Sequence, residues 1–188
     1  MDRILALGRD PAERDALSRA LTALDRSHGL AEKARREPDV LTVLEEFVAR
    51  LQRAFGSVAA LRGKRILDIA CGSNSSRSPE TGARTAAFEP WFCRLLYELD
   101  ADAVGVDAGD LGGEEFECHS VDLSRIGALD FLPDASFDGV HDSRLFGSPE
   151  FRELVKNEPM RESIKMEIRR QERRLLKRGG VIIHTDNP

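Results

Sequence analysis

The chain has 188 residues, a length that fits one domain with an added helical segment. Its 41% hydrophobic and 32% charged residues are typical of a globular protein, and no apolar run approaches the ~20 residues needed to span a bilayer. The formal net charge of −5 argues against a general affinity for nucleic acid.

The first residues have no signal-peptide layout, and the three cysteines, Cys71, Cys93 and Cys118, have no metal-type spacing. We therefore expect a cytoplasmic protein with free thiols, no metal site and no membrane partner.

Residues 1–63 are predicted to form a helical extension. Asp10-Pro11-Ala12-Glu13 is a typical helix start, with Asp10 as N-cap and Glu13 at the capping-box position, and Gly29 is a plausible end. A second helix is expected to begin near residues 38–39, because apolar residues then recur at helical spacing. We expect these helices to pack on a sheet formed by residues 64–188 and to cover a ligand site.

Residues 64–188 alternate between short apolar runs and helical patterns. This alternation predicts an α/β fold, a three-layer, doubly wound and mostly parallel sheet. Helices are expected to begin at residues 89–90 and 148–150, and another is expected to run from about residue 160 to residue 178 and to stop at Gly179-Gly180. The predicted strands are residues 66–70, 103–107, 116–123, 137–141 and 181–184.

The chain is organised around the first of these strands. It ends in a turn of small residues, Ala70, Gly72 and Ser73, followed by Asn74. A strand, a small-residue turn and a following helix form a site for a nucleotide-like ligand. Asp68, near the end of the buried strand, either faces that ligand or ties down the backbone amides of the turn, and the two roles are compatible.

Three further features bear on such a site. Asp107 ends the second strand, where an acid can accept both hydroxyls of a ribose. Cys71 is in the turn, where a small buried residue is more common than a nucleophile. Residues 75–87 form a long polar loop, either a lid in which Arg77 or Arg84 reaches an anionic group, or a surface loop without function.

The last predicted helix is basic, which allows either a nucleic-acid patch or a solvated face. Glu162, Glu167 and Glu172 alternate with its basic residues, and no aromatic residues are interleaved. We therefore favour the solvated face and do not expect a nucleic-acid partner.

From residue 65 to residue 184 the chain resembles a class I S-adenosylmethionine-dependent methyltransferase. Ile66-Leu67-Asp68-Ile69-Ala70-Cys71-Gly72-Ser73-Asn74 resembles the glycine-rich cofactor loop of that family, and Val104-Gly105-Val106-Asp107 resembles its ribose-binding strand. Asp122-Leu123, followed by Leu132-Pro133-Asp134-Ala135-Ser136-Phe137-Asp138-Gly139-Val140, resembles the adenine-side loop and fourth strand of the family. Leu175-Leu176-Lys177-Arg178-Gly179-Gly180-Val181-Ile182-Ile183 resembles its helix end and fifth strand.

This resemblance implies a sheet in the order 3-2-1-4-5 and S-adenosyl-L-methionine as cofactor, with S-adenosyl-L-homocysteine as product. Asp68 and the turn would face the amino-acid end of the cofactor. Asp107, beside Ala108, would bind the ribose, and Asp122 and Leu123 would bind the adenine. His141 and Asp142 would lie near the transferred methyl group, with His141 as the preferred general base.

The chain also departs from the family. Ala70 and Asn74 replace two loop glycines, and strands six and seven of the family have no counterpart after residue 184. The fifth strand would then have an unpaired edge, which predicts either a homodimer through that edge or a reduced form of the fold. The methyl acceptor is unidentified, and a small molecule is favoured.

Two alternatives remain. One is a non-catalytic cofactor-binding or scaffold protein with a methyltransferase-like fold. The other is a nicotinamide-dependent oxidoreductase, which would favour a turn closer to the GxGxxG pattern.

Overall fold

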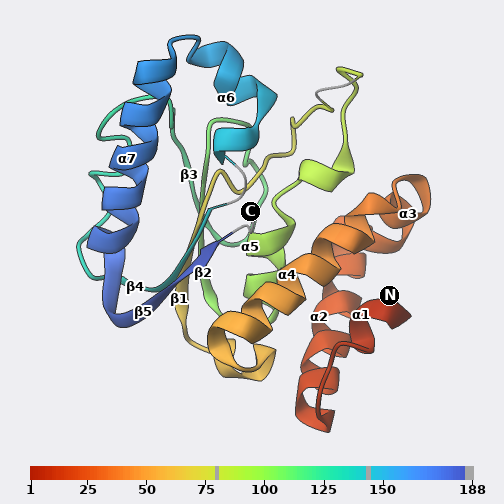
Figure 1. Cartoon of the computed structure of the whole chain (residues 1–188). Helices are drawn as coiled ribbons and strands as arrows, with labels where there is room; N and C mark the ends of the chain where they lie inside the picture. The colour runs from red at the N-terminus through yellow and green to blue at the C-terminus, as the bar shows by residue number, and fades with distance from the viewer. Residues whose placement is uncertain (79–80, 143–144, 185–188) are drawn as a thin grey trace.

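A computed structural model describes residues 1–78, 81–142 and 145–184. Within them a five-stranded, all-parallel sheet has the order β3-β2-β1-β4-β5, which confirms the predicted fold class (Figure 1). The strands are β1 (Arg65–Ile69), β2 (Asp102–Asp107), β3 (Glu117–Ser120), β4 (Phe137–Asp142) and β5 (Leu176–His184).

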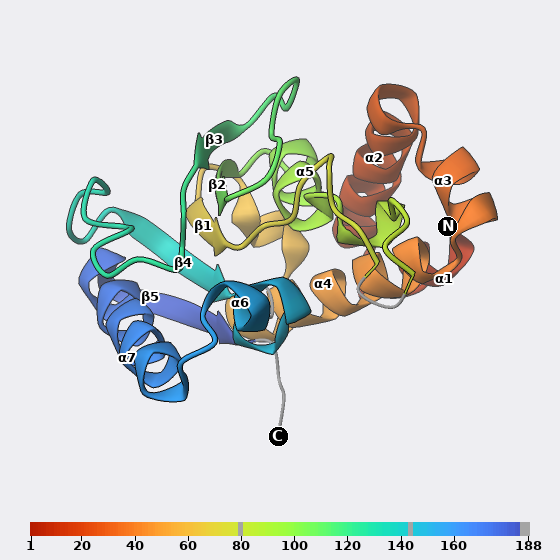
Figure 2. The same ribbon diagram turned by 90° about the horizontal axis from the view of Figure 1, so that it is seen from above.

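Helices cover both faces of the sheet (Figure 2). In the described residues one face carries α1 to α5 and the other carries α6 and α7, as the two apolar cores show. The helices are α1 (Asp2–Leu5), α2 (Pro11–His28), α3 (Leu30–Arg36), α4 (Asp39–Phe55), α5 (Trp91–Glu98), α6 (Pro149–Leu154) and α7 (Glu158–Leu175).

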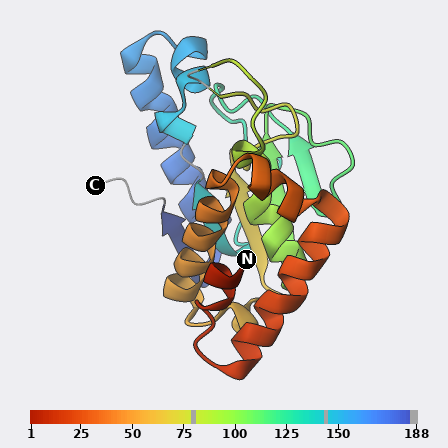
Figure 3. The ribbon, with the colours of Figure 1, turned by 90° about the vertical axis from the view of Figure 1, so that its right-hand side faces the viewer.

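The two cores arise from the alternation of side chains along each strand. On β1, Ile66 belongs to the core with α2, α4 and α5, whereas Leu67 belongs to the core with α6 and α7. Because α1, α2 and α4 share their core with the sheet, the helices of residues 1–63 form one of its covering layers, as Figure 3 shows from their side.

The start and end signals of α2 act as the sequence predicts. The Asp10 carboxylate accepts a hydrogen bond from the amide of Glu13, and Gly29 ends the helix with a φ of 64°. Glu13 goes beyond the expected capping role. Its side chain is 1% exposed and accepts bonds from the amides of Arg9 (2.8 Å) and Val58 (2.9 Å), which joins the start of α2 to the segment before β1.

Two predicted boundaries are wrong. The last helix ends at Leu175 rather than at residue 178, and β5 begins at Leu176, so Gly179 and Gly180 lie inside the strand. The reason is tertiary: the amide of Ser136 bonds to the carbonyl of Leu175, and the β4–β5 register shifts between Phe137 and Gly139, where Gly179 takes a φ of 81°.

The third strand is also shorter than predicted. β3 stops at Ser120 because its partner β2 ends at Asp107, whose carbonyl takes the amide of Val121. At the opposite side of the sheet, β5 pairs only with β4 among the described residues. No helix in residues 1–78, 81–142 and 145–184 has the length and apolar character required to cross a membrane.

The ties of Glu13 generate a stability prediction. Glu13→Ala leaves two backbone amides without their acceptor, so we expect a loss of about 3 kcal/mol in the free energy of unfolding. Asp15→Ala, on the exposed side of the same helix, is the matched control and should change it by less than about 0.5 kcal/mol. Urea denaturation of the two variants measures both values, and equal losses would contradict the role of Glu13.

Candidate functional site

The candidate site lies at the carboxyl edge of the sheet, where β1 and β4 are neighbours. The chain leaves β1 toward α5 on one face and leaves β4 toward α6 and α7 on the other. Loops that depart to opposite faces leave a crevice at such a switch point, which is where ligands bind in open α/β sheets. Asp107, at the tip of β2, lies beside this point because β2 pairs with β1.

The Asp107 carboxylate holds two loops together. Its Oδ2 accepts a hydrogen bond from the amide of Gly72 (3.0 Å), and its Oδ1 accepts one from the amide of Gly109 (2.8 Å). Burial raises the pKa of Asp107, although these amide donors oppose that rise. Tying down the turn amides, a role considered for Asp68, is thus performed here by Asp107.

The turn after β1 is closely packed and strained. Ala70 has a φ of 58°, a left-handed conformation that costs an L-residue about 1–2 kcal/mol. A Cβ on Gly72 would lie 2.2 Å from the carbonyl oxygen of Phe88, and one on Gly109 would lie 2.2 Å from the hydroxyl of Ser73. Small residues are therefore required here by the packing of the protein itself.

Asn74 belongs to a buried ionic group that the sequence analysis missed. We call it the Arg94 cluster: Arg94, Glu89, Glu114, Asn74 and Lys33. Arg94 binds Glu89 (2.6 Å), Glu114 (2.7 Å) and the side-chain oxygen of Asn74 (2.8 Å), and Lys33 of α3 also pairs with Glu89. No spacing in the sequence connects these residues, because they come from four separate segments.

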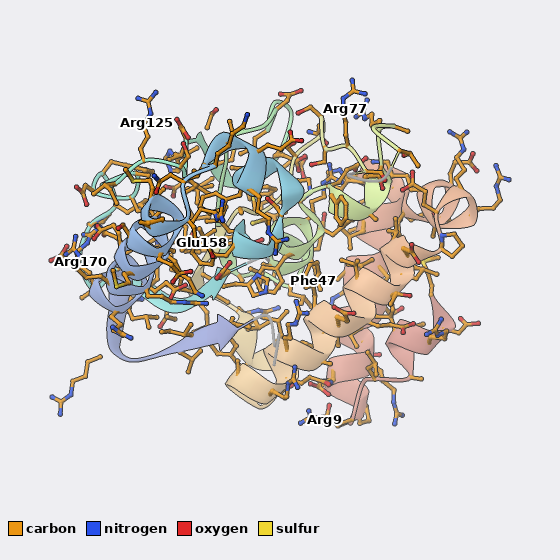
Figure 4. The ribbon with its side chains drawn as sticks, turned by 45° about the horizontal axis from the view of Figure 1, so that its top comes forward. Arg9, Phe47, Arg77, Arg125, Glu158 and Arg170 are labelled. Carbon is orange, nitrogen blue, oxygen red and sulfur yellow. The ribbon has the colours of Figure 1, made fainter. Side chains whose placement is uncertain are left out.

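Asp68 and His141 form a buried pair. His141 Nδ1 lies 2.7 Å from Asp68 Oδ1, and both side chains are 0% exposed. The imidazole stacks on Phe92, with ring centroids 4.0 Å apart, and meets Phe47 edge-on at 5.8 Å. Figure 4 shows Phe47 projecting from α4 toward the middle of the molecule. The pair therefore lies inside the core that α4 and α5 share with the sheet.

Asp142 points toward the opposite face. Its Oδ2 lies 3.3 Å from the guanidinium of Arg169 on α7, which also binds Glu172 at 2.8 Å. Burial raises the pKa of both Asp142 and Glu172, and Arg169 opposes the rise. Strand alternation thus separates His141 from Asp142, and the structure does not bring these two predicted catalytic residues together.

The predicted adenine side and the loop have local partners. Asp122 is exposed, and its carboxylate accepts bonds from Ser124 (2.5 Å) and Arg125 (2.8 Å), while Leu123 is buried in the core with α6 and α7. Arg77 projects outward and donates to the carbonyl of Gly82 (Figure 4). Residues 79–80 of the predicted lid lie outside the described residues.

The fit to a nucleoside cofactor is therefore partial. Asp107, Ala70 and Gly72 are partly exposed, and Ala108 is exposed, so this group is accessible to a ligand. A carboxylate has about four acceptor positions, so Asp107 retains capacity for a ribose diol. Cys71 and Ser73 are instead buried in the turn, and Asn74 binds Arg94. A hydrogen bond with Cys93 lowers the pKa of the Cys71 thiol, but burial and the nearby carboxylates of Asp68 and Asp107 together outweigh it, so the net shift is upward.

No group of three metal-ligating side chains occurs in the described part of the chain. A scan of protein-family models found no family that matches the chain, and a comparison with curated proteins found no match.

The strained turn generates a prediction. Ala70→Gly relieves the left-handed strain but adds freedom to the unfolded chain, so we expect a net gain of about 0.5–1 kcal/mol in unfolding free energy. Ala83→Gly, at an exposed loop position that does not itself have a positive φ, should instead lose a few tenths of a kcal/mol. Chemical denaturation distinguishes the two signs. Destabilisation by both changes would mean that Ala70 is not strained.

The ion group of Arg169 generates a pH prediction. An acid whose pKa is raised on folding contributes stability at low pH and loses it as pH rises through the folded value. Removing the guanidinium raises the pKa of Asp142 and Glu172 further. Arg169→Met should therefore be more destabilised, relative to the native protein, at about pH 8 than at about pH 5.

The matched control is Lys165→Met, on the solvent side of the same helix. Its effect should be small and nearly independent of pH over that interval. Urea denaturation at both pH values provides the comparison, and an Arg169→Met cost that does not grow with pH would contradict the assigned electrostatics.

Proposed function

We propose that the carboxyl edge of the sheet binds S-adenosyl-L-methionine and that the protein transfers its methyl group to a small-molecule acceptor. The observation that carries this proposal is the Asp107 carboxylate. It lies at the tip of β2, is accessible in part, and is held by the amides of Gly72 and Gly109 next to the switch point of a 3-2-1-4-5 sheet. The sequence resemblance to class I methyltransferases supports the same cofactor.

In this proposal the residues of the chain bind and orient. The acceptor positions of Asp107 that the two amides leave open would take the ribose hydroxyls, and the amides keep the carboxylate in place without reorganisation. The bound cofactor would supply an activated methyl group. The protein's remaining contribution is to align the acceptor and to exclude water.

The proposal does not depend on a general base. His141 and Asp142 are buried and point to opposite faces, so their catalytic roles stay predictions. Methyl transfer from a sulfonium needs no base when the acceptor is already nucleophilic. The homodimer through the β5 edge and the cytoplasmic location also stay predictions.

A specific observation favours a second candidate, a non-catalytic cofactor-binding or scaffold protein. The turn after β1 is closed by the chain itself, with the Phe88 carbonyl against Gly72 and the Ser73 hydroxyl against Gly109. A protein that kept the fold and lost methyl transfer would tolerate such closure.

Ligand binding tests the proposal. S-adenosyl-L-homocysteine should raise the thermal stability of the native protein, by ~2.7 kcal/mol at a concentration 100 times its dissociation constant, whereas NADH should not. Asp107→Asn should weaken binding at least about tenfold in calorimetry, because an amide lacks the charge and one acceptor. Asp102→Asn is the control, since Asp102 lies at the other end of β2 and pairs with Arg65.

The outcomes separate the candidates. If saturating S-adenosyl-L-homocysteine does not shift the thermal melting curve of the native protein, the cofactor proposal is contradicted. Binding that Asp107→Asn weakens, without methyl transfer to any of a panel of small amines, phenols, thiols and carboxylates, favours the non-catalytic candidate.

A further inference from the structure

The N-terminal helical segment contacts the segment that lies behind the turn after β1. Glu37 follows α3, and its Oε2 accepts hydrogen bonds from the hydroxyl of Thr85 (2.6 Å) and from the amides of Ala86 (2.9 Å) and Ala87 (3.4 Å). These amides begin the short 3-10 helix η2 (Ala86–Phe88). A carboxylate of residues 1–63 therefore caps a helical turn that belongs to the α/β core.

The electrostatics make this cap strong. The hydrogen bond from the Thr85 hydroxyl, together with the two amides, lowers the pKa of Glu37 even though burial opposes this. Glu37 is thus ionised at neutral pH, and its bonds are charge-assisted. Lys33 of α3 pairs with Glu89 just beyond η2, so α3 and the residue that follows it contact both ends of this short segment.

From η2 the contacts lead directly to the candidate site. The carbonyl of Phe88, the last residue of η2, accepts the amide of Ser73 (3.2 Å) and lies where a Cβ on Gly72 would be only 2.2 Å away. Gly72 in turn donates its amide to Asp107. A displacement of η2 would therefore move the Phe88 carbonyl away from the turn after β1. It would also shift the Gly72 amide, which donates a hydrogen bond to Asp107.

We propose that Glu37 is a positioning residue for the Asp107 site, acting through η2 and the Phe88 carbonyl on the turn after β1. Residues 1–63 thereby complete a ligand site that residues 64–188 supply. The effect on ligand affinity rests on the proposed function, whereas the effect on the turn does not.

The chain offers matched variants. Glu37→Ala removes the acceptor, and Glu37→Gln keeps the size and one acceptor oxygen but not the charge. Glu32→Ala and Glu32→Gln are the controls, because Glu32 is in the same helical segment and pairs with Arg35 and Arg36 at the surface. If Glu37→Ala does not fold, Glu37→Gln and its control carry the test.

The first measurement needs no ligand. Amide hydrogen exchange should become at least about tenfold faster at Gly72 and Ser73 in Glu37→Ala, with a smaller rise in Glu37→Gln. The amide of Leu67, in the middle of β1, should be unchanged, and the Glu32 variants should match the native protein. Faster exchange confined to Ala86 and Ala87 would show a local cap only and would overturn the proposal.

The second measurement is calorimetry with S-adenosyl-L-homocysteine. The dissociation constant should rise at least about fivefold in Glu37→Ala, less in Glu37→Gln, and not in the Glu32 variants. Unchanged affinity in both Glu37 variants would overturn the positioning role. If the native protein does not bind S-adenosyl-L-homocysteine, the proposed function fails. The hydrogen-exchange measurement then decides by itself whether Glu37 positions the turn.

Discussion

The arrangement of the loops at the carboxyl edge of the sheet depends on one buried guanidinium. Arg94, whose side chain is 3% exposed, compensates the carboxylates of Glu89 and Glu114 and binds the side chain of Asn74. A buried carboxylate without a partner costs several kcal/mol, so these segments cannot separate without exposing charge to an apolar interior. Trp91, with its ring centroid 4.8 Å from the guanidinium, closes the same cluster. The turn after β1, α5 and the β2–β3 connection are thus fixed relative to one another.

The other charged side chains at this edge of the sheet lie on its two opposite faces. Asp68 and His141 are paired on the face of α4 and α5, and Asp142 is paired with Arg169 on the face of α7. Between these groups, Asp107 is the acid that stays accessible in part while it binds the amides of two loops. This division explains why the proposed function rests on Asp107 rather than on the histidine.

Much of the fold could be predicted from local patterns. The start of α2 at Asp10 and its end at Gly29 were predictable because capping depends on neighbouring residues only. The end of α7 was not, since Lys177 and Arg178 suit a helix and only the pairing of β5 with β4 makes them strand residues. Within the site, the position of Asp107 was predictable from the strand pattern, but its amide donors come from loops folded against it.

The sequence by itself determined the α/β class, the parallel strands and the acids at their tips, because periodicity and chain direction place these features without reference to distant residues. Only the tertiary structure decided which charges meet. His141 reaches Asp68 through strand register, and Arg94 and Glu37 reach their partners through helix packing. Such pairings depend on the position of whole elements. For that reason the turn that resembles a cofactor loop is also a packed joint between the N-terminal helices and the sheet.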